Sequence, residues 1–204
     1  DTFVIVSFRG TVPTVLQSVL ADARICLEAF AGGRGQVHCG FRDATGALAA
    51  EIDAFIKPQV DAGKKVFITG HSLGGAMATV YAARMVAAGL GGQIGAVYTF
   101  GSPRVGDDAF TAWLGGQLGA RMIRFVNNQD IVTRVAPRAM GYEHMGRIMF
   151  IDDTGRLDGN GAGWVRFLNT VIDAADDFKK AGEKSVKDHS MELYVRRVDN
   201  LVDA

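Results

Sequence analysis

The stretch from Lys65 to Ala76 restricts the possible folds of this chain more than any other. It reads KVFITGHSLGGA: an apolar strand-like run, then Gly-x-Ser-x-Gly, then the start of an alanine-rich helix. A serine on such a sharp strand-to-helix turn projects its hydroxyl clear of the sheet, and side chains larger than glycine at Gly70 and Gly74 would collide there. The helix N-terminus also points at Ser72 and favours developing negative charge. We therefore interpret Ser72 as the nucleophile of a nucleophile elbow. A chance match in a chain with 26 glycines is the alternative, and the flanking strand and helix argue against it.

Strand and helix patterns alternate along the rest of the chain. The order predicts an α/β fold of the α/β-hydrolase type, with a mainly parallel central sheet and helices on both faces. With 204 residues, no internal repeat and no linker, residues 1–204 are expected to form a single domain. The expected strands are 3–8, 36–40, 66–69, 96–100, 122–126 and 147–151, and the expected helices are 45–60, 73–88, 107–118, 164–179 and 187–197.

Charge and motifs exclude several classes of partner. The 22 basic and 22 acidic side chains cancel, and no basic stripe suggests nucleic acid. The longest apolar run, residues 76–90, contains Arg84 and is too short to span a bilayer. No phosphate-binding glycine motif occurs, and no cysteine or histidine spacing suits zinc. Residues 152–160 predict a hairpin turn rather than a calcium loop, because Arg156 stands where a calcium ligand would be needed. We expect no cofactor and no metal.

A serine nucleophile needs a base, and only two histidines follow Ser72 in the chain. In this fold the order is Ser, then Asp or Glu, then His. His144 precedes the strand expected at 147–151, whereas catalytic groups gather beyond the carboxyl ends of strands. We therefore interpret His189 as the base and His144 as a structural hydrogen-bonding residue.

The carboxylate that orients the base is assigned by the same positional argument. Asp130 directly follows the strand expected at 122–126 and is our candidate. Asp152 or Asp153, after the strand at 147–151, is the alternative. Asp107 and Asp108 begin a helix and are interpreted as N-terminal caps.

Two backbone or side-chain donors are needed to hold the oxyanion that forms on the substrate. One is the N–H of Leu73, the residue after the nucleophile. The second should come from the loop after the first strand, where Gly10 and Thr11 stand. The alternative is that Gly10 and Thr11 only form a turn.

The two cysteines, Cys26 and Cys39, lie symmetrically about Gly32 and Gly33. A hairpin turning at these glycines would place the cysteines opposite each other. They then form either a cross-strand disulfide or two small buried apolar residues, and the sequence leaves both open.

Six motifs in order carry a resemblance to the class 3 (fungal-type) lipases. They are VSFRGT at 6–11, VHCGF at 37–41, TGHSLGGA at 69–76, TFGSPRVGD at 99–107, RFVNNQD at 124–130 and DHS at 188–190. The resemblance implies hydrolysis of triacylglycerol or related acyl esters, with Ser72, Asp130 and His189 as triad and Thr11 with Leu73 as oxyanion hole. It also implies secretion and further residues before Asp1. The chain departs from the family at residues 15–18, where a Trp and an acidic residue are usual, and in its long helix at 164–179.

A lid candidate follows Thr11. No charge occurs in residues 11–21, and five apolar side chains fall on one helical stripe: Val12, Val15, Leu16, Val19 and Leu20. Such a helix either covers the acyl pocket in water and adsorbs to a lipid–water interface when open, or packs permanently on the core.

The expected substrate is therefore an acyl ester or lipid, cleaved through an acyl-enzyme. Two other functions remain as alternatives. One is a feruloyl or other small-ester esterase on the same fold. The other is a lipase-like scaffold that binds partners without hydrolysis.

Overall fold

A six-stranded sheet in the order β1-β4-β5-β6-β7-β8 organises the fold. The computed structural model describes residues 2–11, 26–136, 138–158 and 187–202. Neighbouring strands from β1 to β7 run parallel, and only β8 is antiparallel to its neighbour. The strands of this sheet are β1 (Phe3–Phe8), β4 (Lys65–His71), β5 (Ile94–Phe100), β6 (Met122–Asn127), β7 (Arg147–Ile151) and β8 (Leu157–Asp158). A separate antiparallel hairpin consists of β2 (Leu27–Ala29) and β3 (Gln36–His38).

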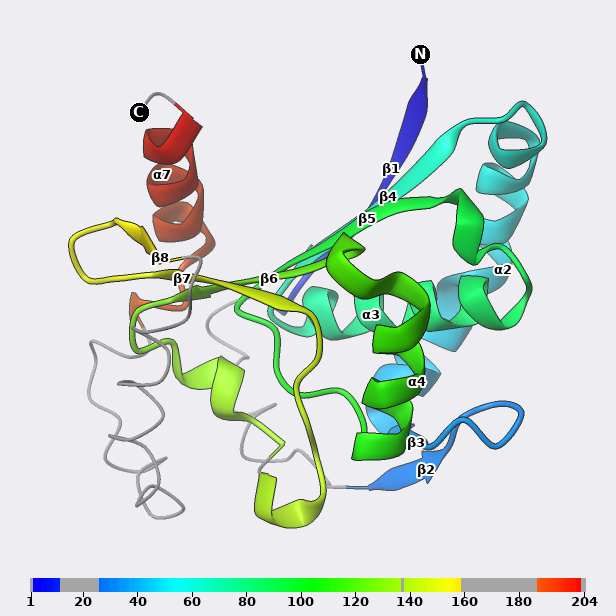
Figure 1. Cartoon of the computed structure of the whole chain (residues 1–204), viewed down its shortest axis with the longest axis horizontal. Helices are drawn as coiled ribbons and strands as arrows, with labels where there is room; N and C mark the ends of the chain where they lie inside the picture. Colours follow the sequence, from blue (N-terminus) through cyan, green and yellow to red (C-terminus); the bar gives the residue numbers. More distant parts are fainter. Residues whose placement is uncertain (1, 12–25, 137, 159–186, 203–204) are drawn as a thin grey trace.

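Helices lie on both sides of the sheet (Figure 1). α2, α3 and α4 lie together on one side, whereas α7 lies on the other, where Tyr194 packs against His71 and Phe100. The helices are α2 (Cys39–Asp61), α3 (Leu73–Ala87), α4 (Asp108–Leu118) and α7 (Met191–Val202), with short 3-10 turns η1 (Gly91–Gln93), η2 (Gly119–Arg121), η3 (Ile131–Arg134) and η4 (Arg138–Met140). Within the part of the chain that the structure describes, no helix is both long and apolar enough to cross a membrane.

The main core lies between the sheet and α3. One lateral row of the sheet joins Val6, Ile68, Val97 and Met122, all buried. α3 is buried on every face from Gly74 to Ala83, which explains why its sequence is small and apolar all round rather than amphipathic. The core therefore anchors the helix that follows Ser72.

Most expected elements agree with the structure. Every expected strand is present within two residues of its predicted bounds, and α3 and α4 within one residue. α2 begins at Cys39, six residues before the predicted start, because the His38 side chain caps it by accepting from the Gly40 N–H. The last helix begins at Met191 instead of 187. The helix predicted at 164–179 and the lid stripe Val12, Val15, Leu16, Val19 and Leu20 lie outside the described residues.

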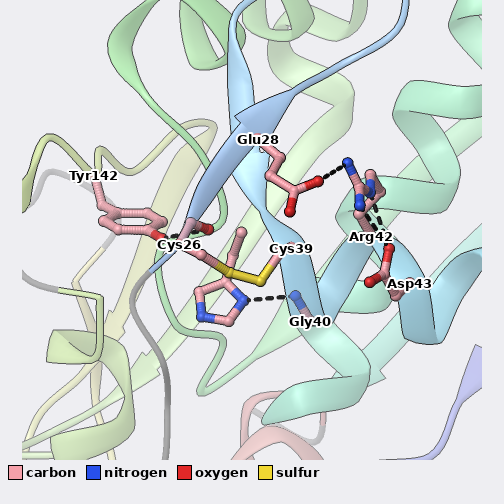
Figure 2. Close-up of a disulfide and its surroundings, with 8 residues drawn as sticks. Cys26, Glu28, Cys39, Gly40, Arg42, Asp43 and Tyr142 are labelled. Atoms are coloured by element: carbon pink, nitrogen blue, oxygen red, sulfur yellow. Dashed lines mark hydrogen bonds and ion pairs between the residues drawn. A yellow bond between two sulfur atoms is a disulfide. The ribbon is translucent and has the colours of Figure 1, made fainter.

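A disulfide closes the β2–β3 hairpin (Figure 2). The register pairs Leu27 with His38, which places Cys26 opposite Cys39 with their Cα atoms 5.7 Å apart. The Cys39 N–H donates to the Cys26 carbonyl at 3.0 Å, and the Tyr142 hydroxyl donates to the same carbonyl at 3.2 Å. The sequence left open a disulfide or two unpaired cysteines, and the structure shows the disulfide.

The same two cysteines lie close to His38, and the three potential ligand atoms are within 4.8 Å of one another. The two sulfur atoms are bonded to each other. They are therefore not thiolates, the form in which cysteine binds a metal ion.

Removing this bridge should destabilise the protein without rearranging the sheet. The cysteines are 13 residues apart, and closing a loop of that size stabilises a folded domain by about 3 kcal/mol. We expect the Cys26→Ser/Cys39→Ser double variant to unfold at a lower urea concentration than the wild type. Dithiothreitol should lower the wild-type midpoint to that of the variant and leave the variant unchanged. A wild-type midpoint that does not respond to the reductant, with two titratable thiols in the native protein, would contradict the bridge.

Candidate active site

Ser72 stands on a strained turn between β4 and α3. Its backbone has φ 58° and ψ −129°, a region that residues with a side chain rarely adopt and that costs on the order of 1–3 kcal/mol. The Ser72 N–H donates to the Phe100 carbonyl at 2.9 Å, which ties the turn to the end of the neighbouring strand. The local geometry is that of a nucleophile elbow, as the sequence predicted.

The glycines around Ser72 are required by close backbone contacts. A Cβ on Gly70 would lie 2.2 Å from the Gly74 carbonyl oxygen, and a Cβ on Gly74 would lie 2.1 Å from the Phe8 carbonyl oxygen. Neither contact can be relieved by rotating a side chain, because both neighbours are backbone atoms. These contacts hold β1, β4 and α3 together at the elbow.

Asp130 and His189 form a buried pair at the same edge of the sheet. Nδ1 of His189 lies 2.9 Å from each carboxylate oxygen of Asp130. His189 is 4% exposed and Asp130 is 0% exposed. Because an ionised carboxylate only accepts hydrogen bonds, Nδ1 carries the proton and donates it. In the neutral ring, Nε2 is then free to accept a proton.

Ser72 Oγ and His189 Nε2 are both buried and have no hydrogen-bond partner among the described residues. The bond between them that general-base catalysis requires is thus not formed in this structure. Such bonds are often long in the absence of substrate and tighten when it binds.

Two further donors hold the Asp130 carboxylate. The Val132 N–H donates to Oδ1 at 2.9 Å, and the Tyr194 hydroxyl donates to Oδ2 at 2.6 Å. Burial, together with the charge of Asp130, raises the pKa of Tyr194 well above its usual value, so the hydroxyl stays protonated.

Sequence reasoning missed Tyr194. The available signal was a large polar-tipped side chain in a helix directly after the predicted base, since a buried tyrosine hydroxyl needs a partner.

His71, beside the nucleophile, supports His189 directly. The two imidazole rings stack with centroids 4.4 Å apart, and His71 Nε2 lies 2.8 Å from the His189 carbonyl oxygen. A carbonyl only accepts, so His71 Nε2 carries a proton and donates it. Burial, together with the neighbouring His189, lowers the pKa of His71 to about 4. His71 is therefore a neutral structural support.

The loop after β1 places Thr11 beside the elbow. A Cβ on Gly10 would lie 2.5 Å from the His71 carbonyl oxygen and 3.3 Å from Ser72 Cβ, so the loop touches the nucleophile's own turn. Leu73 is the first residue of α3, and its N–H has no helical partner four residues earlier. The loop that carries Thr11 and the first residue of α3, Leu73, therefore both lie next to Ser72.

The alternative candidates lie elsewhere. His144 is half-buried, and its Nε2 donates to the Thr133 carbonyl at 2.8 Å. Asp107 caps α4 by accepting from the Phe110 N–H, and Asp152 accepts bonds within the β7–β8 turn. Asp153 is exposed in that turn.

A largely apolar groove of about 790 Å³ adjoins the candidate site. Gly10, Thr11, His71, His189 and Met191 are among the residues that line it.

This fold and elbow define an α/β-hydrolase. Residues 5–140 match the family described as Lipase (class 3), and the chain belongs to that family. The resemblance noted in the sequence is therefore confirmed.

Named relatives agree with this assignment. A secreted mono- and diacylglycerol lipase 1 from Fusarium solani is 40% identical over 124 residues, covering 60% of this chain and 36% of the relative. A lipase from Rhizomucor miehei is 35% identical over 151 residues, covering 72% of this chain and 41% of the relative. The solved structure of the Rhizomucor miehei triacylglyceride lipase superposes with a TM-score of 0.73 at 28% identity, covering 93% of this chain and 70% of that one. The chain thus spans less than half the length of these two sequence relatives.

Gly101 provides a test of the Asp130–His189 pair. At φ 56°, a Cβ on this residue would lie 2.5 Å from Asp130 Oδ2 and 2.9 Å from His189 Nδ1. Gly119 has nearly the same φ, 54°, but no atom within 4 Å of a Cβ. We expect Gly101→Ala to abolish ester hydrolysis, measured on p-nitrophenyl butyrate. Gly119→Ala should lose only about 1–3 kcal/mol of stability and keep its turnover. Equal turnover in the two variants would mean that the pair is not needed for activity.

The low pKa of His71 predicts a pH dependence of stability. Between about pH 6.5 and 4 the unfolded chain binds a proton that the folded chain does not, so acidification lowers the free energy of unfolding. Between pH 7 and pH 5 this loss amounts to about 2 kcal/mol for His71. Urea unfolding of His71→Gln should show a pH effect smaller by that amount. His144, whose pKa burial also lowers, contributes to both proteins alike. An identical pH effect in the variant would exclude His71 as the titrating group.

Proposed function

We propose that this chain is the hydrolase domain of an acylglycerol lipase, in which Ser72, Asp130 and His189 cleave a carboxylic ester through an acyl-enzyme. The observation that carries the proposal is the buried Asp130–His189 pair beside a serine on a strained elbow, in a member of the class 3 lipase family. A buried acid–base pair next to an unpartnered hydroxyl is the arrangement that nucleophilic acyl transfer needs.

The proposed reaction begins when His189 Nε2 takes the proton of Ser72 Oγ, which attacks the ester carbonyl carbon. The carbonyl oxygen becomes an oxyanion and accepts hydrogen bonds from the Leu73 N–H and from Thr11. Asp130 stays ionised and stabilises the protonated imidazole. His189 then gives its proton to the leaving alcohol. Water attacks the acyl-enzyme by the same route and regenerates Ser72.

The substrate class and the compartment are supported by relatives. Proteins that match this chain are named as secreted mono- and diacylglycerol lipases and as a triacylglycerol lipase. The Cys26–Cys39 disulfide is consistent with secretion, because such bonds persist mainly in oxidising compartments. Adsorption to a lipid–water interface is part of the proposal. The role of residues 12–20 as a lid stays a prediction.

The test is a variant series with two readouts. Ser72→Ala should lose both ester hydrolysis and labelling by a fluorophosphonate while keeping the wild-type circular dichroism spectrum. His189→Ala and Asp130→Asn should each lower kcat by about 10³-fold or more. Asp153→Asn is the matched control, since Asp153 is an exposed carboxylate after the next strand. If Asp153→Asn is inactive while Asp130→Asn is active, the acid is wrongly assigned.

A substrate panel on the same variants separates the candidate functions. Diacylglycerol and triacylglycerol emulsions, phosphatidylcholine vesicles and a feruloyl ester should be compared at equal protein concentration. We expect acylglycerols to be cleaved fastest. Preference for the vesicles would favour a phospholipase, the name of a rice relative that is 30% identical over 97% of this chain. Preference for the feruloyl ester would favour the small-ester alternative. No labelling of the wild type by the fluorophosphonate would favour the non-catalytic scaffold.

A further inference from the structure

Asn127, the last residue of β6, is fully buried and has all four of its polar groups bonded. Its backbone N–H donates to the Tyr194 hydroxyl at 2.9 Å, and its carbonyl accepts from the Asp130 N–H at 2.9 Å. Its side-chain Nδ2 donates to the Asp188 carbonyl at 2.7 Å, and its Oδ1 accepts from Arg197 Nη1. Every one of these partners lies in the loop after β6 that contains Asp130 (the acid loop, residues 128–130), in the loop before α7 that contains His189 (the base loop, residues 187–190) or in α7.

The side-chain bond from Asn127 to the Asp188 carbonyl orients the backbone at His189. That carbonyl belongs to the peptide unit joining Asp188 to His189, so the bond fixes the orientation of the backbone from which the imidazole projects. The Asp188 side chain adds two bonds between the same loops, accepting from Asn128 Nδ2 at 3.0 Å and from the Gln129 N–H at 3.3 Å. The base loop is thus held by three consecutive residues, Asn127, Asn128 and Gln129.

The backbone bonds of Asn127 hold Asp130 and the tyrosine that donates to it. Its carbonyl holds the N–H of Asp130, and its N–H fixes the Tyr194 oxygen that donates to Asp130 Oδ2. Because the Tyr194 oxygen accepts from Asn127, its single proton is directed at the carboxylate. Position 127 is therefore bonded to both sides of the pair: its backbone holds Asp130 and Tyr194, and its side chain holds the peptide unit that precedes His189.

We propose that Asn127 is a positioning residue that sets the geometry of the Asp130–His189 hydrogen bond. A residue needed only for packing at the end of a buried strand would be apolar, like its neighbour Val126, which is also fully buried. Burying an amide in the core costs free energy of desolvation that an apolar side chain would not incur. The presence of an amide here therefore indicates that its bonds to one loop and to α7 are needed. The consequence for turnover rests on the proposed function, whereas the consequence for the hydrogen bond does not.

The experiment compares Asn127→Leu, which keeps a similar shape without polar atoms, with the wild type. The first readout is the low-field proton resonance of His189 Nδ1–H, which needs no substrate. The second is the split between kcat and KM on a p-nitrophenyl ester. We expect loss or displacement of the resonance and a fall in kcat of about 10²-fold with KM nearly unchanged, because misplacing catalytic groups by about 1 Å has an effect of that size.

Leu118→Ala is the control for general destabilisation, since Leu118 is buried at the end of α4 and belongs to the main core. It should lower the melting temperature while keeping the resonance and kcat. Asn127→Ser, which is smaller and keeps a polar group, replaces Asn127→Leu if the latter does not fold. Unchanged resonance and kcat at position 127, or the same losses in Leu118→Ala, would overturn the positioning role. If the wild type neither hydrolyses esters nor reacts with a fluorophosphonate, the proposed function fails and the resonance alone decides the role of Asn127.

Discussion

The contact between the backbone of Gly74 and the Phe8 carbonyl supports the rest of the candidate site. It brings the first turn of α3 against the end of β1, at a distance that excludes even a methyl group. The contact places the loop carrying Gly10 and Thr11 beside Ser72 and fixes the direction of the helix whose N-terminus faces Ser72. A small, apolar α3 buried on all sides is what makes so close an approach to the sheet stable. The strain at Ser72 is therefore held by the core and not by the site itself.

The acid and the base reach the same place by a different principle. Asp130 comes from the loop after β6, and His189 comes from the chain just before α7, 59 residues later. They meet because parallel strands direct their carboxyl ends to one edge of the sheet and because α7 lies on the face opposite α3. Tyr194 is central to this arrangement, since it contacts His71 and Phe100 on the sheet and Asp130 in the loop.

Sequence reasoning located the residues whose position follows from local pattern. Ser72 was marked by its glycines and Asp130 by its place after a strand. His189 was chosen by the order of the triad and because His144 precedes its strand. The start of α2 was misplaced because its cap is His38, which is not one of the usual capping residues. Asn127 and Tyr194 were not singled out, because their roles depend on hydrogen bonds across 61 to 67 residues that no short-range pattern encodes. The hairpin at Gly32 and Gly33 was predicted, whereas the bond between its cysteines depended on a register that only the structure shows.

The side on which α7 lies has a consequence for the dynamics of the protein. Much of its surface faces solvent, and Tyr194 is the buried residue at its centre. We expect an element held in this way to open at a lower free energy than the core of the fold, and to open as a unit. A single opening of α7 withdraws the tyrosine from the carboxylate and Arg197 from Asn127, and it pulls on the loop that bears the imidazole. Such an opening would take the site apart while the elbow and the sheet remain folded, so we expect the stability of the α7 contact to limit the lifetime of the assembled site.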